Sequence, residues 1–456
     1  MTSRLQSIRQ VSRRDFLKWS AGLLLTSSVG DLSLIHNPAR ARRSTDVLVI
    51  GAGAAGLSAA QSLHAEGLGV IVLEARERLG GRMWSDYDLA PYPIELGAEF
   101  LHGSTVSTWD WIVKTKLNGS RDKGETFYVY LDSLLQPDWS LQRDYLAELE
   151  AALEDWDGDE DAPISALLSD LRLSDEEVRL LNNLFAPDNA ADLDEYGIFG
   201  YNEATFEGDG TGDWRVVEGY SALARAMADG LDVRLNSIVQ RIAWDADGVE
   251  VTTQDGAIYE ATKLIVTLPL GVLQRGSVTF DPELPSWKQR AIQRLGVGIV
   301  NKLILKFREP VWPDDLSVLA TPLSTQLWWR PGFDREEEIP IMTALIGGSS
   351  GAAFSRLSQQ EAIQSGLADL ERMLGRRLSG LLVEGRFVNW GADPHSLMGY
   401  SYAPPGTVGL RRDLARDVQG VLYFAGEATN TTHPGTVHGA IDSGEEAAHT
   451  MLVAWR

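Results

Sequence analysis

Three glycines and one acid near residue 50 have the types and spacing to bind a dinucleotide. Gly51, Gly53 and Gly56 directly follow the apolar run 47–50, which is typical of a buried parallel strand. The first glycine permits a tight turn, the second lets backbone approach a pyrophosphate, and the third lets a helix pack on the strand. Glu74 ends a second apolar run, where a carboxylate can bind ribose hydroxyls. A glycine-rich turn without a ligand is the alternative, and the order strand, helix, strand, acid favours the dinucleotide.

The elements that must position this motif are two strands and the helix between them. A helix is predicted over 54–66, and its first residues, Ala54 and Ala55, would direct free N–H groups toward the phosphates. Further strands are predicted within 233–251 and at 263–268, 298–307 and 420–425, and further helices at 214–231 and 436–453.

One lysine lies inside a strongly apolar segment that alternates like a strand. Lys302 is either a residue of an edge strand or a buried functional amine, whose pKa burial would lower. The pattern alone leaves both interpretations open.

The composition bounds the class of protein. A chain of 456 residues can bury a large core and form two domains. The absence of cysteine excludes disulfides, thiolate metal ligands, catalytic thiols and cysteinyl cofactor links, and no metal site is predicted. The net charge of -23 argues against a nucleic-acid partner, which requires a basic face.

The N-terminus has the features of an export signal rather than of a folded domain. Arg13 and Arg14 lie in a twin-arginine motif, followed by the apolar run 19–29 and the cleavage signal 39–41. The apolar run is too short to span a bilayer, so no stable membrane anchor is expected. We therefore predict that residues 1–41 are a signal peptide, that the twin-arginine export machinery is a partner, and that the protein is periplasmic, secreted or otherwise extracytoplasmic.

Acidic residues are concentrated in one segment. Residues 144–213 contain 21 Asp or Glu, two Arg and no Lys, with apolar residues at roughly helical spacing. Acidic helices are therefore predicted. A solvated face accounts for most of these acids, and an electrostatic funnel for a cationic substrate is the sharper alternative.

Further motifs follow in order along the chain. They are Gly80-Gly81-Arg82, Gly97-Ala98 with His102-Gly103, Thr267 to Leu273, Asn301-Lys302, Trp390 with Tyr400, Phe424-Ala-Gly-Glu427, and Pro434 to Gly439. With the glycine motif, they resemble the flavin-containing amine oxidase family of monoamine oxidases, polyamine oxidases and lysine-specific histone demethylases. The resemblance extends from Asp46 to about Ala448.

The resemblance implies an α/β fold, α+β overall, with two interleaved domains. A Rossmann-like FAD-binding domain is expected over 45–103, 217–295 and 393–456. A substrate-binding domain of the amine-oxidase type is expected over 104–216 and 296–392.

By position, the resemblance also implies the residues that bind FAD. They are Gly51, Gly53, Ala54, Ala55, Gly56, Glu74, Ala75, Arg76, Gly81, Arg82, Gly97, Ala98, Glu99, Val239, Trp390, Gly426, Glu427, Thr436 and Val437. Glu74 is expected to hold the adenosine ribose, Val239 to meet the adenine side, and Glu427 to lie at the ribityl-pyrophosphate. Gly399 stands where monoamine oxidases carry the flavin-linked cysteine, so the FAD is expected to be non-covalent.

Three residues match catalytic positions of the family. Lys302 matches the lysine that holds a water against flavin N5, and Tyr400 matches one wall of the aromatic cage in front of the ring. His102 matches a position that faces the substrate amine in polyamine oxidases. Thr436 takes the second cage position, often a tyrosine, which weakens a monoamine oxidase interpretation.

The implied reaction is oxidation of a polyamine such as spermine or spermidine. Hydride passes from the amine-bearing carbon to flavin N5, the imine hydrolyses to aldehyde and amine, and O2 is reduced to hydrogen peroxide. Five acids could pair with distal ammonium groups: Glu99, Glu203, Glu207, Asp209 and Asp213.

Other functions stay open from the sequence. An L-amino-acid oxidase for arginine or lysine usually holds the α-carboxylate with an arginine soon after the Gly-Gly-Arg motif, yet no arginine lies between Arg82 and Arg121. A monoamine oxidase is a further alternative. A non-catalytic exported flavoprotein is disfavoured by the joint presence of Lys302, His102 and Tyr400.

Overall fold

The computed structural model describes residues 42–455 apart from 123–125, 138, 157, 159, 205–208 and 334. The export signal predicted over residues 1–41 and the acid Glu207 therefore lie outside the described residues.

The larger main sheet carries the glycine motif. Its strands are β1 (Arg42–Ile50), β2 (Val70–Leu73), β10 (Asp232–Arg234), β11 (Val239–Trp244), β12 (Val249–Thr253), β13 (Ile258–Val266), β14 (Thr279–Asp281) and β22 (Leu422–Phe424). They follow the order β10-β2-β1-β13-β12-β11-β14, with β22 also paired to β13. The run β10-β2-β1-β13 is parallel, whereas β12 is antiparallel to both its neighbours. Residues 47–50 of β1 are at most 2% exposed, which confirms the buried parallel strand.

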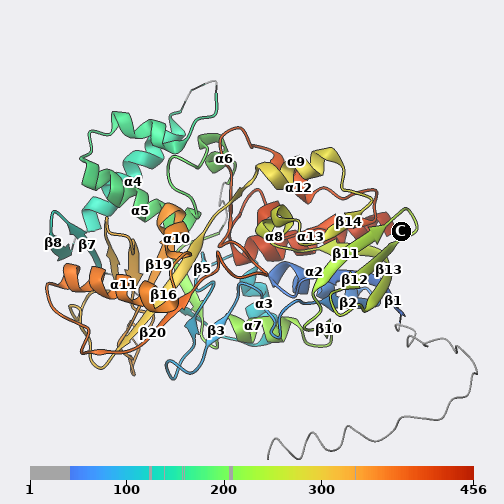
Figure 1. Cartoon of the computed structure of the whole chain (residues 1–456), viewed down its shortest axis with the longest axis horizontal. Helices are drawn as coiled ribbons and strands as arrows, with labels where there is room; N and C mark the ends of the chain where they lie inside the picture. The colour runs from blue at the N-terminus through green and yellow to red at the C-terminus, as the bar shows by residue number, and fades with distance from the viewer. Residues whose placement is uncertain are drawn as a thin grey trace, which may run out of the picture. The chain divides into compact units, whose positions relative to one another are not determined.

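Two helices from opposite ends of the described chain pack together beside this sheet (Figure 1). They are α2 (Ala54–Ala65) and α13 (Val437–Trp455). Gly444 makes the approach close, because a Cβ at this position would lie 2.2 Å from the Ala55 carbonyl oxygen. This contact holds the first turn of α2, which follows the glycine motif, against α13.

The second main sheet holds Lys302. Its strands are β7 (Phe127–Leu131), β8 (Leu134–Pro137), β16 (Val300–Phe307), β17 (Val318–Ala320), β18 (Leu327–Trp329), β19 (Ile341–Gly347) and β20 (Leu382–Val388), in the order β20-β16-β19-β18-β17-β7-β8. Strand β16 lies between two antiparallel partners, and α11 (Gln359–Leu374) covers it, with Gly366 against Leu303. Lys302 is consequently a buried amine, 3% exposed, and not a residue of an edge strand.

The acidic segment folds into helices, as predicted. They are α4 (Trp139–Glu154), the 3-10 helix η1 (Ile164–Asp170), α5 (Asp175–Asn189) and α6 (Ile198–Glu203). Helix α5 begins with a capping box between Ser174 and Glu177 and buries Leu180, Leu181 and Leu184 on its inner face. Apolar residues at helical spacing thus anchor the helices, while many of the acids stay outside.

The helix predicted over 214–231 is wrong in its first part. Residues Asp213–Val216 form β9, which pairs with β5 (Leu101–His102) and β6 (Gly119–Arg121). Gly219, with a φ of 86°, then turns the chain into α7 (Tyr220–Met227). Pairing with two distant strands overrides the local helical pattern.

The remaining elements are short and connect these layers. They are β3 (Ser85–Asp86), β4 (Ile94–Glu95), β15 (Gly296–Val297), β21 (Ser401–Tyr402), α3 (Thr108–Thr115), α8 (Leu270–Arg275), α9 (Ser286–Arg294), α10 (Gly348–Phe354), α12 (Leu410–Ala415) and the 3-10 helix η2 (Glu427–Thr429). Strands of the larger sheet and strands of the second sheet come from alternating stretches of the chain. The domain boundaries themselves stay a prediction.

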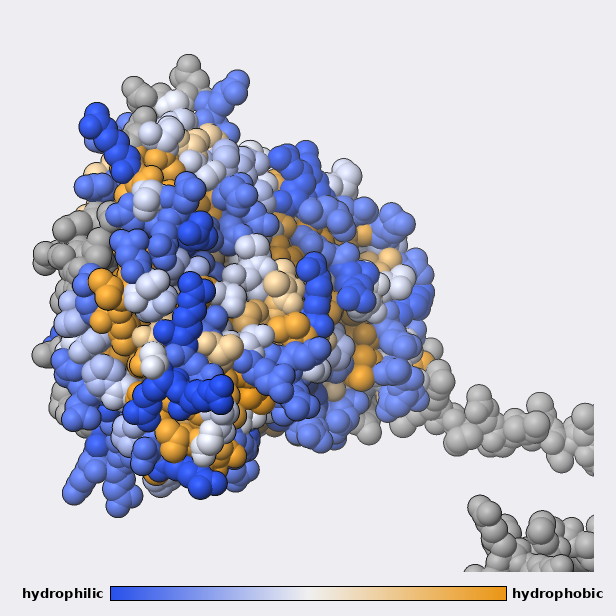
Figure 2. Space-filling view, turned by 60° about the vertical axis from the view of Figure 1, so that its left-hand side comes forward, coloured by the Kyte–Doolittle hydropathy of each residue, from blue (hydrophilic) through white to orange (hydrophobic). Residues whose placement is uncertain are grey.

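The surface around the second sheet is mainly hydrophilic, with hydrophobic residues scattered over it (Figure 2). Acids of the segment 144–213 such as Glu148, Glu154 and Asp175 are exposed, as a solvated face requires. Within the described part of the chain, no helix combines the length and the apolar character that crossing a membrane requires.

Candidate functional site: a deep cavity between the two main sheets

A cavity of about 1300 Å³ opens where the glycine motif, β16 and the first turn of α13 meet. This volume exceeds the roughly 300–1,000 Å³ of a typical small-molecule site, so it can hold a dinucleotide and a substrate together. The catalytic candidates Lys302, His102 and Tyr400 all line it. So do all the residues predicted to bind the cofactor except Gly56.

The glycines of the motif have different surroundings. Gly51 has a φ of 102°, and a Cβ at Gly56 would lie only 1.9 Å from the Gly51 carbonyl oxygen. Gly56 thus serves the packing of α2 on the turn, the part expected of the third glycine, and it is not among the residues that line the cavity. A Cβ at Gly53 would meet only the Gly80 carbonyl oxygen, at 4.0 Å, so the backbone here is open to the cavity.

Glu74 ties the end of β2 to the glycine turn. Its carboxylate accepts hydrogen bonds from the backbone N–H of Ala52 at 2.8 Å and of Arg76 at 2.9 Å. Arg76 in turn donates to Asp393 Oδ1 at 2.6 Å, and both Glu74 and Arg76 line the cavity. The arrangement leaves carboxylate lone pairs for hydroxyl groups of a ligand.

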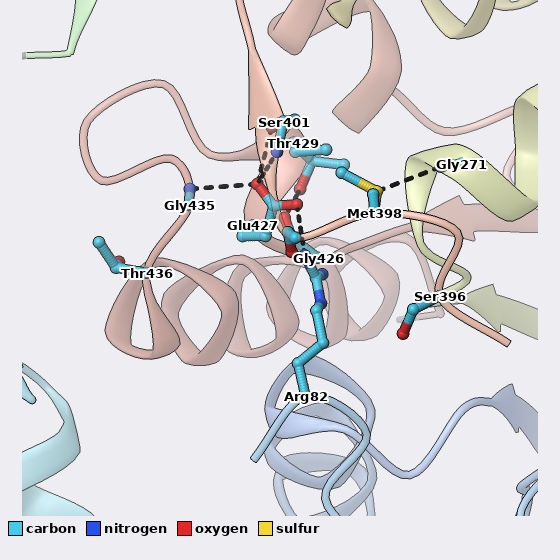
Figure 3. Close-up of polar contacts among 12 residues, drawn as sticks. Arg82, Gly271, Ser396, Met398, Ser401, Gly426, Glu427, Thr429, Gly435 and Thr436 are labelled. Carbon is cyan, nitrogen blue, oxygen red and sulfur yellow. Dashed lines mark hydrogen bonds and ion pairs between the residues drawn. The ribbon is translucent and has the colours of Figure 1, made fainter. Parts of the chain in front are cut away.

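Arg82, from the Gly-Gly-Arg motif, and Glu427, after β22, form an ion pair on the cavity wall (Figure 3). Arg82 Nη1 lies 3.0 Å from Glu427 Oε1, while Glu427 Oε2 accepts from Ser401 Oγ at 2.7 Å and from the Gly435 N–H at 3.1 Å. Burial raises the pKa of Glu427, but Arg82 and Arg411 outweigh it and hold that pKa below its ordinary value. A fixed carboxylate therefore lies beside Gly426, where a Cβ would meet open space.

Lys302 forms a buried ion pair with Glu99. Its Nζ lies 2.8 Å from Glu99 Oε2 and 3.0 Å from the Glu95 carbonyl oxygen. Glu99 Oε1 also accepts from Trp329 Nε1 at 2.9 Å and from Arg215 Nε at 3.1 Å. Burial raises the pKa of Glu99, and the two cations lower it by more, so the carboxyl is ionised. Glu99 therefore orients the lysine and is not free to pair with a substrate ammonium.

The predicted cage residues are held by hydrogen bonds at their polar ends. Tyr400 Oη donates to the Pro187 carbonyl oxygen, and burial raises the pKa of this phenol. Trp390 Nε1 donates to the Leu96 carbonyl oxygen at 3.0 Å. Thr436 Oγ1 accepts from the Gly439 N–H at 2.9 Å, which caps the first turn of α13. All three residues line the cavity, and these hydrogen bonds fix their side chains there.

His102 lies among acids in the same cavity. Its Nδ1 is 2.9 Å from Asp213 Oδ1, and 58% of its side chain is accessible because it faces the cavity. Burial lowers the pKa of His102, but hydrogen bonding and attraction to Asp213 raise it above its ordinary value overall. The histidine is therefore held by Asp213 on the cavity wall, where it can meet a substrate.

Asp188 is a site residue that sequence reasoning did not single out. It lies in the last turn of α5 and lines the cavity, and it has no hydrogen-bond or ion-pair partner among the described residues. The Asp188 side chain is open to the cavity, and its enclosure by the surrounding cavity wall raises its pKa to about 6. It was one acid of many in 144–213, and no local spacing distinguishes it from its solvated neighbours.

Four of the five acids expected near distal ammonium groups lie within the described residues, and they divide into two groups. Asp209 and Asp213 line the cavity. Glu203 does not, because it lies 3.5 Å from Arg412 Nη2 and accepts from the Gly409 N–H. Together with Glu99, it is removed from the list of candidate ammonium partners.

Each arginine on the cavity wall already has a carboxylate partner within the described residues. The pairs are Arg76 with Asp393, Arg82 with Glu427, Arg215 with Glu99 and Asp122, and Arg330 with Glu338. A ligand carboxylate would have to displace one of these partners.

The residues of the cavity fit a flavin dinucleotide on structural grounds. Open backbone at Gly53 and Gly426, the N-termini of α2 and α13, and the placed carboxylate of Glu74 are the groups that phosphates, a flat ring and ribose hydroxyls require.

Comparison with known proteins agrees with this geometry. The family model described as flavin containing amine oxidoreductase matches residues 54–452. Polyamine oxidase 4 of Oryza sativa subsp. japonica is 33% identical over 435 residues, covering 88% of this chain and 87% of that protein. Human lysine-specific histone demethylase 2 is 30% identical over 98% of this chain, which spans only 58% of that longer protein.

Among solved structures, cyclohexylamine oxidase from Brevibacterium oxydans IH-35A superposes with a TM-score of 0.79 at 21% identity, covering 90% of this chain and 99% of that one. This likeness supports the α/β amine-oxidase fold. From the family match and the identities above, the chain belongs to the flavin containing amine oxidoreductase family and is a flavin-dependent amine oxidase.

Proposed function

We propose that the protein is an FAD-dependent, O2-using oxidase of polyamines such as spermine and spermidine. The observation that carries the proposal is the charge of the cavity: Asp188 is unpaired within the described residues, while the cavity arginines are all engaged by carboxylates. The cavity therefore favours a ligand with several cationic groups and no carboxylate. The similarity to a rice polyamine oxidase over most of both chains supports the same substrate class.

The residues have distinct parts in this proposed reaction. The chemistry that a bound flavin supplies is acceptance of a hydride from the amine-bearing carbon, with O2 as the final oxidant. Asp188 holds a distal ammonium group by charge, and His102, positioned by Asp213, faces the substrate amine. Tyr400 and Trp390 confine the chain of the amine, and Lys302, oriented by Glu99, holds a water close to the reacting carbon. The product imine then hydrolyses to an aldehyde and an amine.

The FAD is proposed to be non-covalent. Gly399 stands where a linking cysteine would be, and its carbonyl oxygen accepts a hydrogen bond from Arg82 Nη1. A Cβ at Gly399 would lie 2.7 Å from Val300 Cβ. The chain also has no cysteine elsewhere. Acid precipitation should release all yellow colour into the supernatant, and flavin retained in the washed pellet would contradict this part of the proposal.

A panel of substrates tests the main proposal. We expect higher kcat/KM for peroxide formation with spermine or spermidine than with L-arginine, L-lysine or simple monoamines. L-arginine is the informative comparison, because it is also cationic at its side chain but adds a carboxylate. Faster oxidation of L-arginine than of every polyamine tested would replace the proposal with a basic L-amino-acid oxidase.

Export by the twin-arginine pathway is also proposed, on the sequence of residues 1–41 alone. This route carries folded proteins, which suits a chain that binds its flavin before export. Replacing Arg13 and Arg14 by lysine should retain the protein in the cytoplasm. Unchanged export of that double variant, measured by cell fractionation, would contradict the assignment.

A further inference from the structure

A second cluster of titratable side chains lies on the cavity wall and has no part in the reaction proposed above. Asp209 Oδ1 is 2.8 Å from His433 Nε2, and Asp209 Oδ2 is 3.6 Å from His438 Nε2. One potential ligand atom from each residue can be chosen so that all lie within 4.8 Å of one another. Asp209 and His438 also line the cavity, so the cluster can be reached from it.

His438 gives an independent indication of a ligand. The residue is 3% exposed, and its Nε2 has no hydrogen-bond partner among the described residues. Buried polar atoms are normally paired, so this nitrogen calls for an explanation. Its separation of 3.6 Å from Asp209 is too long for a hydrogen bond. Two ligand atoms of one tetrahedral Zn²⁺, each about 2.0–2.1 Å from the ion, lie roughly 3.3 Å apart. The distance between His438 Nε2 and Asp209 Oδ2 is close to this value.

We propose that Asp209, His433 and His438 bind a divalent transition-metal ion of the Zn²⁺ type. Two imidazole nitrogens and one carboxylate oxygen form a ligand set that first-row metal ions prefer, and they leave a coordination position for water. Ca²⁺ and Mg²⁺ prefer ligand sets made of oxygen and suit this cluster poorly.

A second carboxylate lies near the ring nitrogen of His433 that does not face Asp209. Asp442 Oδ2 lies 3.7 Å from His433 Nδ1, on the opposite side of the ring from Asp209. Metal-binding histidines commonly direct their other nitrogen toward a carboxylate, which fixes the orientation of the ring. Asp442 is therefore a positioning residue for His433.

The site would join two separate parts of the fold. Asp209 lies in the loop before β9, whose backbone is held by the hydrogen bond from the Thr105 N–H to the Asp209 carbonyl oxygen at 2.9 Å. His433 precedes α13 and His438 lies in its first turn, with the two rings 4.8 Å apart. A bound ion would fasten the loop to the start of α13.

Zinc binding to the flavin-loaded protein tests the proposal. After treatment with a chelator and dialysis, titration with Zn²⁺ in competition with a chromogenic chelator should show one site per chain. Asp209→Asn and His433→Gln should each weaken binding at least tenfold, and Asp442→Asn should weaken it about 10–100-fold. His449→Gln, which changes an exposed histidine on the same helix, is the matched control and should bind as the wild type does.

Retention of flavin absorbance by each variant shows that the fold is intact, and the conservative Asp442→Asn variant covers the case in which a ligand variant does not fold. Co²⁺ in place of Zn²⁺ should give a ligand-field spectrum that the ligand variants lack. Absence of a stoichiometric site in the wild type, or equal affinity in the wild type, Asp209→Asn and His433→Gln, would overturn the proposal.

Discussion

Lys302 Nζ lies 2.8 Å from Glu99 Oε2, and both side chains are 4% exposed. The lysine comes from the interior strand β16, and the glutamate from the loop before β5. A buried pair of this kind is expensive to desolvate, and its members are fixed only because further hydrogen bonds satisfy both ends. Here Trp329 and Arg215 satisfy Glu99, and the Glu95 carbonyl oxygen satisfies Lys302.

We expect Lys302→Met to retain flavin and fold but to slow at least one half-reaction by about tenfold or more, the scale of one well-placed acid–base group. The fold should survive because Glu99 keeps Arg215 as a partner. Stopped-flow measurement of flavin reduction and of reoxidation separates the two half-reactions. Lys306→Met, on the same strand, is the control. Unchanged rates in both half-reactions would assign Lys302 a structural role.

Asp188 should make the binding of a cationic substrate depend on pH. Its pKa is raised to about 6, so it gains its negative charge as the pH rises through that value. We therefore expect kcat/KM for spermine in the wild type to rise between pH 5 and 7 relative to Asp188→Asn, with most of the difference in KM. The exposed Asp194→Asn variant should follow the wild type. A ratio of wild type to Asp188→Asn that does not change with pH would contradict this role.

Replacement of Gly53 should lower the affinity for flavin, whereas replacement of Gly56 should lower the stability of the fold. A Cβ at Gly53 enters the cavity, so Gly53→Ala should fold but lose flavin affinity by about tenfold or more, with little change in the Tm of the apoprotein. A Cβ at Gly56 meets the Gly51 carbonyl oxygen at 1.9 Å, so Gly56→Ala should cost about 3 kcal/mol or more of stability. Flavin titration and thermal unfolding measure the two effects. Equal loss of stability in both variants would show that Gly53 also serves packing.

Lys288 should make stability depend on pH. It is completely buried, its Nζ donates to the Leu414 carbonyl oxygen at 2.7 Å, and burial lowers its pKa to about 7 from 10.5. The unfolded chain binds this proton more tightly than the folded chain, so the free energy of unfolding should rise as the pH increases from about 7 to 10.5. Below pH 7 the lysine is charged in both states, and the full cost of burying that charge lowers the stability. The full effect is at most about 5 kcal/mol.

Comparison of Lys288→Met with the wild type isolates this contribution. The Tm of the variant relative to the wild type should be higher at pH 6 than at pH 9. Loss of the hydrogen bonds from Lys288 to the carbonyl oxygens of Leu414 and Arg416 lowers the Tm of the variant at both pH values. The exposed Lys114→Met variant should show no such trend. A difference in Tm that stays constant from pH 6 to pH 9 would show that Lys288 titrates normally.

The sequence by itself predicted the glycine turn and the carboxylate of Glu74 beside it, because these parts are local. Gly51, Gly53 and Glu74 lie within one strand–helix–strand unit, whose geometry follows from backbone sterics and hydrophobic periodicity. The acidic helices were also predictable, since each carries its own apolar stripe. The assignment of more distant cavity residues required resemblance to a family as well.

Tertiary structure alone decided the partners of the charged groups. Whether Lys302 lies on an edge strand depends on which strands flank β16 in the sheet. The residue pattern of a single strand does not reveal its partners. Glu99 looked like a candidate for a substrate ammonium until burial placed Lys302 and Arg215 beside it. Asp188 became distinct from other acids only where α5 ends in the cavity, because a carboxylate acquires an altered pKa from its surroundings and not from its neighbours in sequence.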